Sequence, residues 1–90
     1  MTQMKSTPAP MSAHAAVQAA ILAVAPEAEE DLALLTPDDS LREMLDLDSL
    51  DFLAVLEHVA KLTGVSVPES DYLEVDSLAG FERYLARRMG

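Results

Sequence analysis

Residues 46–64 read DLDSLDFLAVLEHVAKLTG and contain the clearest helical pattern in the chain. From Ser49 to Leu62, apolar residues recur every three or four positions, the spacing that places side chains on one side of a helix. Gly64 predicts the end of this helix, because glycine readily adopts the left-handed conformation that closes a helix. Two adjacent apolar stripes result, and we expect both to be largely buried: Leu50, Leu53, Leu56 and Ala60 in one, and Phe52, Val55, Val59 and Leu62 in the other.

The start of this helix presents a serine. Asp48 is a suitable N-cap residue, and Asp51 follows three positions later, where an acidic side chain can bond back to the cap. Ser49 then lies in the first turn, on the solvent side, and we expect Leu47 and Leu50 to anchor the backbone on either side of it. The sequence therefore predicts an exposed hydroxyl group at Ser49.

Another helical run and a long connection precede this stretch. Residues 11–25 are rich in alanine and have apolar residues at helical spacing; Ser12 can cap this helix and Pro26 ends it. The connection that follows has too many leucines for a free linker, so we predict a packed loop. Ser40 and Glu43 have capping-box spacing and predict a short turn that docks three apolar side chains on the helices: Leu41, Met44 and Leu45.

Two further helical segments end the chain. Residues 68–73 begin with proline and contain acids, which suits the first turn of a short helix. Asp76 or Ser77 can cap a last helix that runs to Met89 and buries four side chains: Leu78, Phe81, Tyr84 and Leu85. Three longer helices, one short helix and no convincing strand predict an all-α fold, a small four-helix bundle with a long structured loop between its first two helices.

The length of the chain fits one small domain. We expect residues 1–10 to form a flexible N-terminal tail and residues 11–90 to form the folded domain. A domain of this size seldom encloses a deep catalytic pocket. Size therefore favours a carrier, an adaptor or a binding module.

Composition excludes several classes of protein. The chain has no cysteine, so it cannot form a disulfide or supply a thiol of its own. From Glu27 to Asp76 there are fifteen acidic residues and only two cations, Arg42 and Lys61, so this segment has a net charge of −13. Such a negative charge repels nucleic acid and attracts basic patches on proteins. With neither a secretion signal nor a membrane-spanning stretch, we expect a cytoplasmic monomer without nucleic-acid partners or stable membrane insertion.

No residue is placed by sequence to activate Ser49. His58 lies nine residues further along the helix and His14 lies in the first helix, so we expect no catalytic residue and an external enzyme that modifies the serine. The aspartates around Ser49 partly match a calcium-binding loop, but Leu50 replaces a ligand and Asp51 replaces the turn glycine. We therefore predict no metal site.

Three segments around the serine carry a family resemblance: LREML at residues 41–45, DSLDFL at 48–53 and GVSVP at 64–68. In this order they resemble acyl carrier proteins and related phosphopantetheine-binding domains. The resemblance extends over roughly residues 11–88, and residues 40–68 carry most of it.

This resemblance implies that Ser49 receives a 4′-phosphopantetheine arm from coenzyme A through a phosphopantetheinyl transferase, with Asp48 and Leu50 beside the attachment point. The terminal thiol of the arm carries acyl or aminoacyl groups as thioesters between partner enzymes, and an apolar interior can shelter part of the attached chain. The helix after the serine is the main partner-binding surface of the family, and its acids meet basic docking patches on loading ligases or synthases. The candidate partner-binding residues here are Asp48, Asp51 and Glu57.

Departures from the family pattern bear on the pathway. Ala54 and Ala60 stand where many carriers of fatty acid biosynthesis have acids, and Thr63 stands where an aromatic residue is usual. These changes leave both fatty acid biosynthesis and a specialised lipid, polyketide or related pathway open. Asp46 replaces the usual glycine, which suggests a different loop path.

Other interpretations of the same residues remain. A second Asp-Ser-Leu occurs at residues 76–78, but Ser77 fits an N-cap and lacks the Asp-Phe-Leu that follows Ser49's own motif. An unmodified acidic helical adaptor that binds a basic protein partner is the alternative function, and it differs from a carrier only in lacking the arm. The sequence contains no nucleophile with a base, no metal cluster and no glycine-rich phosphate loop, which argues against a self-sufficient enzyme.

Overall fold

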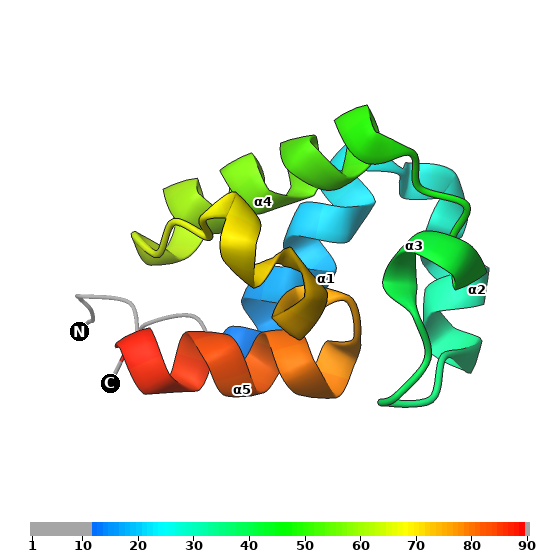
Figure 1. The fold of residues 1–90 in the computed structure, drawn as a ribbon. Coiled ribbons are helices and arrows are strands. Elements are labelled where there is room, and N and C mark those ends of the chain that lie inside the picture. Colours follow the sequence, from blue (N-terminus) through cyan, green and yellow to red (C-terminus); the bar gives the residue numbers. More distant parts are fainter. Residues whose placement is uncertain (1–11, 90) are drawn as a thin grey trace, which may run out of the picture.

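The structure, a computed structural model, describes residues 12–89, and over these residues the protein is helical and without a β-strand (Figure 1). The elements in chain order are α1 (Ala13–Val24), the 3₁₀ helix η1 (Pro26–Ala28), α2 (Glu29–Leu34), α3 (Leu41–Met44), α4 (Ser49–Thr63), the 3₁₀ helix η2 (Glu69–Val75) and α5 (Leu78–Met89). The predicted all-α fold is confirmed. The predicted tail, residues 1–10, lies outside the described residues. None of the helices described is long and apolar enough to cross a membrane.

The core lies where α1 packs against both α4 and α5 (Figure 1). Each of these three longer helices contributes fully buried side chains: Val17 and Ile21 from α1, Val55 and Val59 from α4, and Phe81, Tyr84 and Leu85 from α5. The short elements lie around this contact, with α2 and α3 at one end of the bundle. The interior is therefore thin and apolar, as expected for a domain of this size.

Helix ends follow the predicted local signals. The Oγ atom of Ser12 accepts a hydrogen bond from the backbone N–H of Ala15 at 3.1 Å, and Ser40 Oγ accepts one from the N–H of Glu43 at 3.3 Å. Gly64 closes α4 with a left-handed φ of 78°. These contacts depend only on residues within one turn, which is why the sequence predicts them.

Only one side of α4 is buried, which corrects the prediction that both of its apolar stripes face the core. Leu50 is 77% exposed, Leu53 is 42% exposed and Leu62 is 44% exposed. Because α4 lies at the surface and packs on α1, the inward side takes residues from both stripes and leaves others of each stripe exposed. The buried residues of α4 are Phe52, Val55, Leu56 and Val59. Leu50 therefore does not anchor the backbone beside the serine, whereas Leu47 is buried as predicted.

The connection between α1 and α4 is packed, as predicted, and contains η1, α2 and α3. Leu41 and Leu45 are buried, but Met44 is 54% exposed, so the prediction that Met44 docks is wrong. Leu41 and Leu45 are four residues apart and share the inward side of this turn, which leaves Met44 on the outward side.

Asp76 joins this connection to the start of α5. Its Oδ2 atom accepts a hydrogen bond from Ser40 Oγ at 2.7 Å, and its Oδ1 atom accepts one from the backbone N–H of Arg42 at 3.1 Å. Ser77 Oγ instead accepts a hydrogen bond from the N–H of Gly80 at 3.0 Å. Of the two predicted caps, Ser77 therefore caps α5, while Asp76 positions α3.

The segment η2 bridges α4 and α5. The ring of Tyr72 meets the ring of Phe52 edge to face, with centroids 5.7 Å apart. On the α5 side, the hydroxyl of Tyr84 donates a hydrogen bond to Asp71 at 2.6 Å, and the guanidinium of Arg88 lies 3.6 Å from the centroid of the Tyr84 ring. The short helix predicted at residues 68–73 is present as this 3₁₀ helix, Glu69–Val75.

Candidate functional site

Ser49 is the first residue of α4, and it is exposed. Asp48 Oδ1 accepts a hydrogen bond from the N–H of Asp51 at 2.8 Å, and Asp51 Oδ2 accepts one from the N–H of Asp48 at 3.4 Å. This is the predicted capping box. Because the two aspartates cap the helix, the hydroxyl of Ser49 takes no part in capping and remains accessible.

The loop before the serine turns at Asp46. The backbone of Asp46 is left-handed, with φ of 54°, and the neighbouring Leu45 and Leu47 are buried. Glycine adopts this conformation readily, and aspartate tolerates it at some cost. A glycine would also fit the observed backbone, and the different loop path suggested by Asp46 stays a prediction.

Arg42 lies beside the serine. Its Nη2 atom donates to Ser49 Oγ at 3.5 Å, and its guanidinium carbon lies 5.3 Å from the centroid of the Phe52 ring. The residue is partly buried, and its backbone N–H is bonded to Asp76. A cation is thus placed next to the exposed hydroxyl in a strongly acidic part of the chain.

A cavity of about 220 Å³ opens next to the serine. Its walls come from α3, from the first turn of α4 and from η2: Arg42, Ser49, Phe52, Glu69 and Tyr72. Two aromatic rings supply apolar walls, while Arg42 and Glu69 supply opposite charges. The hydroxyl of Ser49 therefore stands at the edge of a space large enough for a small organic group.

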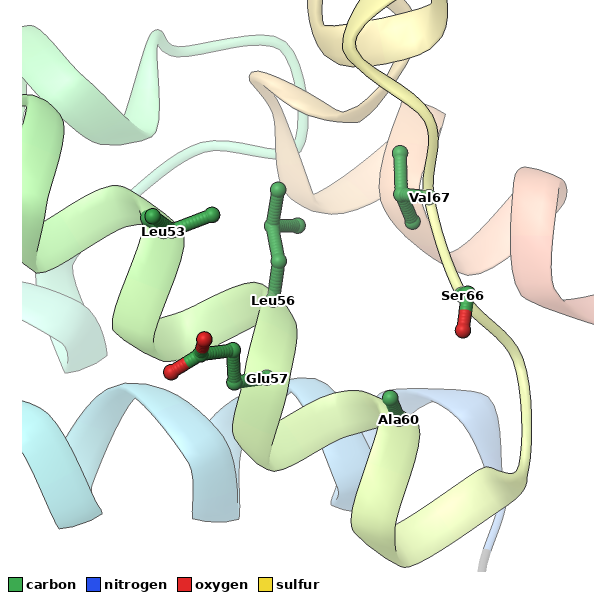
Figure 2. A pocket seen from close by; sticks show the side chains of 6 residues that line it. All are labelled: Leu53, Leu56, Glu57, Ala60, Ser66 and Val67. Atoms are coloured by element: carbon green, nitrogen blue, oxygen red, sulfur yellow. The ribbon is translucent and has the colours of Figure 1, made fainter.

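A smaller cavity of about 120 Å³ lies further along α4, against the segment that follows this helix. Figure 2 shows Leu53, Leu56 and Ala60 of α4 on one side and Ser66 and Val67 on the other. The carboxylate of Glu57, also in this lining, points away from Val67 in the same view (Figure 2). This cavity is mainly apolar.

The chemistry of the site is that of an unactivated hydroxyl. His58 is nine residues along α4 from Ser49, or about 13 Å at the rise of a helix. His14 Nδ1 lies 2.7 Å from Glu82 Oε2, in a contact between α1 and α5. Within residues 12–89, no group of three or more His, Cys, Asp or Glu side chains could hold a metal ion. The site can present a hydroxyl for modification, but none of these histidines is placed to deprotonate it.

The second Asp-Ser-Leu differs in its local structure. Ser77 is partly buried, and its Oγ atom is engaged with the N–H of Gly80 at the start of α5. Its hydroxyl serves as a helix cap, whereas that of Ser49 is exposed beside a cavity.

The structure brings three of the predicted residues together at the start of α4: Asp48, Ser49 and Asp51. Leu50 is exposed next to them, and Glu57 is exposed two turns further along. The sequence analysis missed four residues of the cavity: Arg42, Phe52, Glu69 and Tyr72.

One signal in the sequence could have found Arg42, because it is one of only two cations between residues 27 and 76. No comparable signal exists for Glu69 and Tyr72. Their position at the cavity depends on how η2 folds back onto α4.

Comparison with known proteins gives one match. The model of a protein family described as the phosphopantetheine attachment site matches residues 15–85, which is most of the chain. No curated protein and no solved structure matches. The match confirms the predicted family resemblance and the predicted 4′-phosphopantetheine cofactor.

Proposed function

Because the chain belongs to the phosphopantetheine attachment-site family, we propose that it is an acyl carrier protein with Ser49 as the attachment residue. One observation carries this assignment: Ser49 combines an exposed hydroxyl, freed from capping by Asp48 and Asp51, with an adjacent cavity. Ser77, the other serine in the same tripeptide, has its hydroxyl engaged as a cap.

The residues around Ser49 fit the prosthetic group. Arg42 offers a cation for the phosphate, and the cavity offers aromatic walls for the organic part of the arm. When bound, the group supplies a thiol that carries acyl or aminoacyl groups as thioesters. The chain has no cysteine, so this thiol would be its only one.

Attachment and loading are assigned to other enzymes. The hydrogen bond to Ser49 Oγ comes from Arg42, a donor that cannot accept the hydroxyl proton, so we assign the modification of Ser49 to a phosphopantetheinyl transferase and the later chemistry to ligases or synthases. The protein's own part is to hold the serine accessible and to present a docking surface. Carrier domains of this family bind such enzymes in general.

The docking surface proposed here is the exposed side of α4. Glu57 lies exposed on this side, and Leu50 and Leu53 are exposed apolar side chains near the serine. An acidic surface with apolar contacts suits a partner with a basic patch. Fatty acid biosynthesis and a specialised lipid or polyketide pathway are both compatible with this surface.

Two expectations from the sequence remain part of the proposal. The protein acts as a cytoplasmic monomer, and residues 11–90 form the carrier domain behind a tail of residues 1–10.

The test is the intact mass of the chain after incubation with coenzyme A and a broad-specificity phosphopantetheinyl transferase. A gain of one phosphopantetheinyl group that maps to Ser49 is expected. Ser49→Ala should abolish the gain and change the free energy of unfolding by less than about 0.5 kcal/mol, since the side chain is exposed and uninvolved in packing.

Ser77→Ala is the matched control, and it should still be loaded although it loses a helix cap. Loading of Ser49→Ala would contradict the assignment. A folded wild type that is never loaded would favour the unmodified adaptor.

A further inference from the structure

Arg42 has an unusual place in the charge distribution. The segment from Glu27 to Asp76 carries a net charge of −13, and Lys61 is its only other cation. Among the ion pairs of residues 12–89, none includes Arg42. Its guanidinium instead faces Ser49 Oγ at 3.5 Å. It is therefore available to an anion that forms at this oxygen.

The position of Arg42 is fixed by contacts on both its backbone and its side chain. Its N–H donates to Asp76 at 3.1 Å, and its carbonyl oxygen accepts a hydrogen bond from the N–H of Leu47 at 2.9 Å. The guanidinium also lies over the ring of Phe52. A side chain placed in advance loses less freedom when it binds, so its contact with an anion is more favourable.

Attachment of a phosphodiester at Ser49 places an anion beside two carboxylates. The carboxylates of Asp48 and Asp51 are both within the capping box of the same turn. Like charges at this separation repel, whereas a guanidinium forms paired, charge-assisted hydrogen bonds with phosphate oxygens. Arg42 is the cation next to the oxygen that would carry the phosphate.

Resting on the proposed function, we propose that Arg42 is a positioning residue that binds the phosphodiester and holds the first part of the arm over the 220 Å³ cavity. The portion of the arm next to the phosphate carries two methyl groups and a hydroxyl. Phe52 and Tyr72 supply apolar walls for the methyl groups, and Glu69 supplies an acceptor for the hydroxyl.

The experiment compares apo and loaded forms of wild type, Arg42→Ala, Arg42→Lys and Lys61→Ala. Intact mass first establishes loading of each form, which tests the proposed function separately. The ³¹P resonance of the loaded protein is then measured at low and high salt. In wild type the resonance is expected to differ from that of the same loaded protein unfolded in urea, which carries the same phosphodiester, and to move toward it with salt, because an exposed ion pair is screened.

Arg42→Ala is expected to lose this difference in chemical shift at every salt concentration. Arg42→Lys should retain part of it, since an ammonium group keeps the charge but not the paired hydrogen bonds. Lys61→Ala removes the same charge twelve residues along α4, about 18 Å from the serine, and should match wild type.

A second measurement uses wild type alone, so it does not depend on loading of the variants. The ¹H and ¹⁵N resonances of the Arg42 Nε–H group are expected to shift on loading. An unshifted Nε–H group, or a loaded Arg42→Ala protein with the ³¹P resonance of wild type, would overturn the proposal while leaving attachment at Ser49 intact. If wild type gains no mass on incubation with the transferase, the proposed function itself is contradicted.

Discussion

At the scale of single residues, the exposure of Ser49 depends on its neighbours. Asp48 and Asp51 satisfy each other's backbone N–H groups, so the helix begins without using the serine hydroxyl. On the preceding side, buried Leu45 and Leu47 hold the chain against the core, and Asp46 turns it between them. The turn and the cap together place an unused hydroxyl at the surface.

Asp46 provides a test of this turn. Its φ of 54° costs an L-residue about 1–2 kcal/mol, whereas glycine adopts it without this cost. Asp46→Gly is therefore expected to leave the free energy of unfolding unchanged or to raise it by up to about 1 kcal/mol. Asp46→Ala, which removes the same charge but keeps the Cβ atom, should be about 1 kcal/mol less stable than Asp46→Gly. Urea unfolding of the three proteins measures both differences, and equal stability of the two variants would exclude strain at this residue.

At the scale of elements, the sequence predicts what depends on neighbours within a turn. The ends of α1, α3 and α4 have their predicted caps, and the core side of α5 is buried as predicted. Periodicity alone could not decide which apolar side chains of α4 face inward, because both stripes have helical spacing and only the packing on α1 distinguishes the buried side. The cavity at Ser49 was missed for a similar reason, since it forms only when η2 folds back beside α3 and α4.

Gly80 lies where η2 and α5 approach each other closely. A Cβ atom at this position would overlap the carbonyl oxygen of Glu74 and would lie 3.0 Å from Ser77 Oγ. In an ordinary helix, Gly→Ala stabilises by about 0.5–1 kcal/mol. Gly80→Ala is instead expected to lower the free energy of unfolding by about 1–3 kcal/mol, because backbone must move to relieve the overlap.

Ala86→Gly in the same helix is the control for ordinary helix propensity, since Ala86 is exposed. It should cost about 1 kcal/mol. Thermal and urea unfolding would measure both variants, and a Gly80→Ala protein more stable than wild type would show that η2 does not pack closely on α5.

The hydroxyl of Tyr84 makes the contact between α5 and η2 sensitive to pH. Burial, followed by the hydrogen bond to the Asp71 carboxylate, raises the pKa of the Tyr84 hydroxyl above its usual value, and the nearby Arg88 opposes this shift. A raised pKa in the folded state stabilises the protein fully below the unfolded pKa of about 10, and this contribution is lost as pH rises through the folded pKa. The contact should therefore weaken in alkaline solution.

Tyr84→Phe removes this titration together with one hydrogen bond. At neutral pH it should lower the free energy of unfolding by about 1 kcal/mol. As pH rises above about 10, the urea unfolding curves of wild type and Tyr84→Phe should converge, because only wild type loses the contribution of the neutral hydroxyl. A difference in stability that stays constant at alkaline pH would contradict this role of Tyr84.

At the scale of the whole molecule, the basic end of the chain is partly neutralised by the protein itself. Arg87 Nη2 of α5 lies 3.1 Å from Glu74 Oε1, and Arg88 Nη2 lies 3.8 Å from Asp71 Oδ2. These two cations therefore form ion pairs with acids of η2. Along α4, only Lys61 opposes the carboxylates, and it lies in the last turn. The surface near Ser49 therefore keeps its negative charge, which is what a partner with a basic patch would meet.

Glu57 allows this surface to be tested without disturbing the site. Reversing Asp51 would break the capping box, so a slower reaction of that variant could reflect an altered helix start. Glu57 lies exposed along α4, and Glu57→Lys is expected to lower kcat/KM of loading by a phosphopantetheinyl transferase by about two- to fivefold at low salt. At high salt the effect should largely disappear, because salt shortens the range of the interaction between exposed charges, from about 10 Å at 0.1 M to about 3 Å at 1 M. Asp38→Lys makes the same change in net charge at an exposed residue between α2 and α3 and is the matched control; the segment that joins these two helices lies apart from α4 in Figure 1. If both variants slow loading equally, the transferase responds to net charge alone; if only Glu57→Lys does so, and only at low salt, the exposed side of α4 is the surface that partners bind.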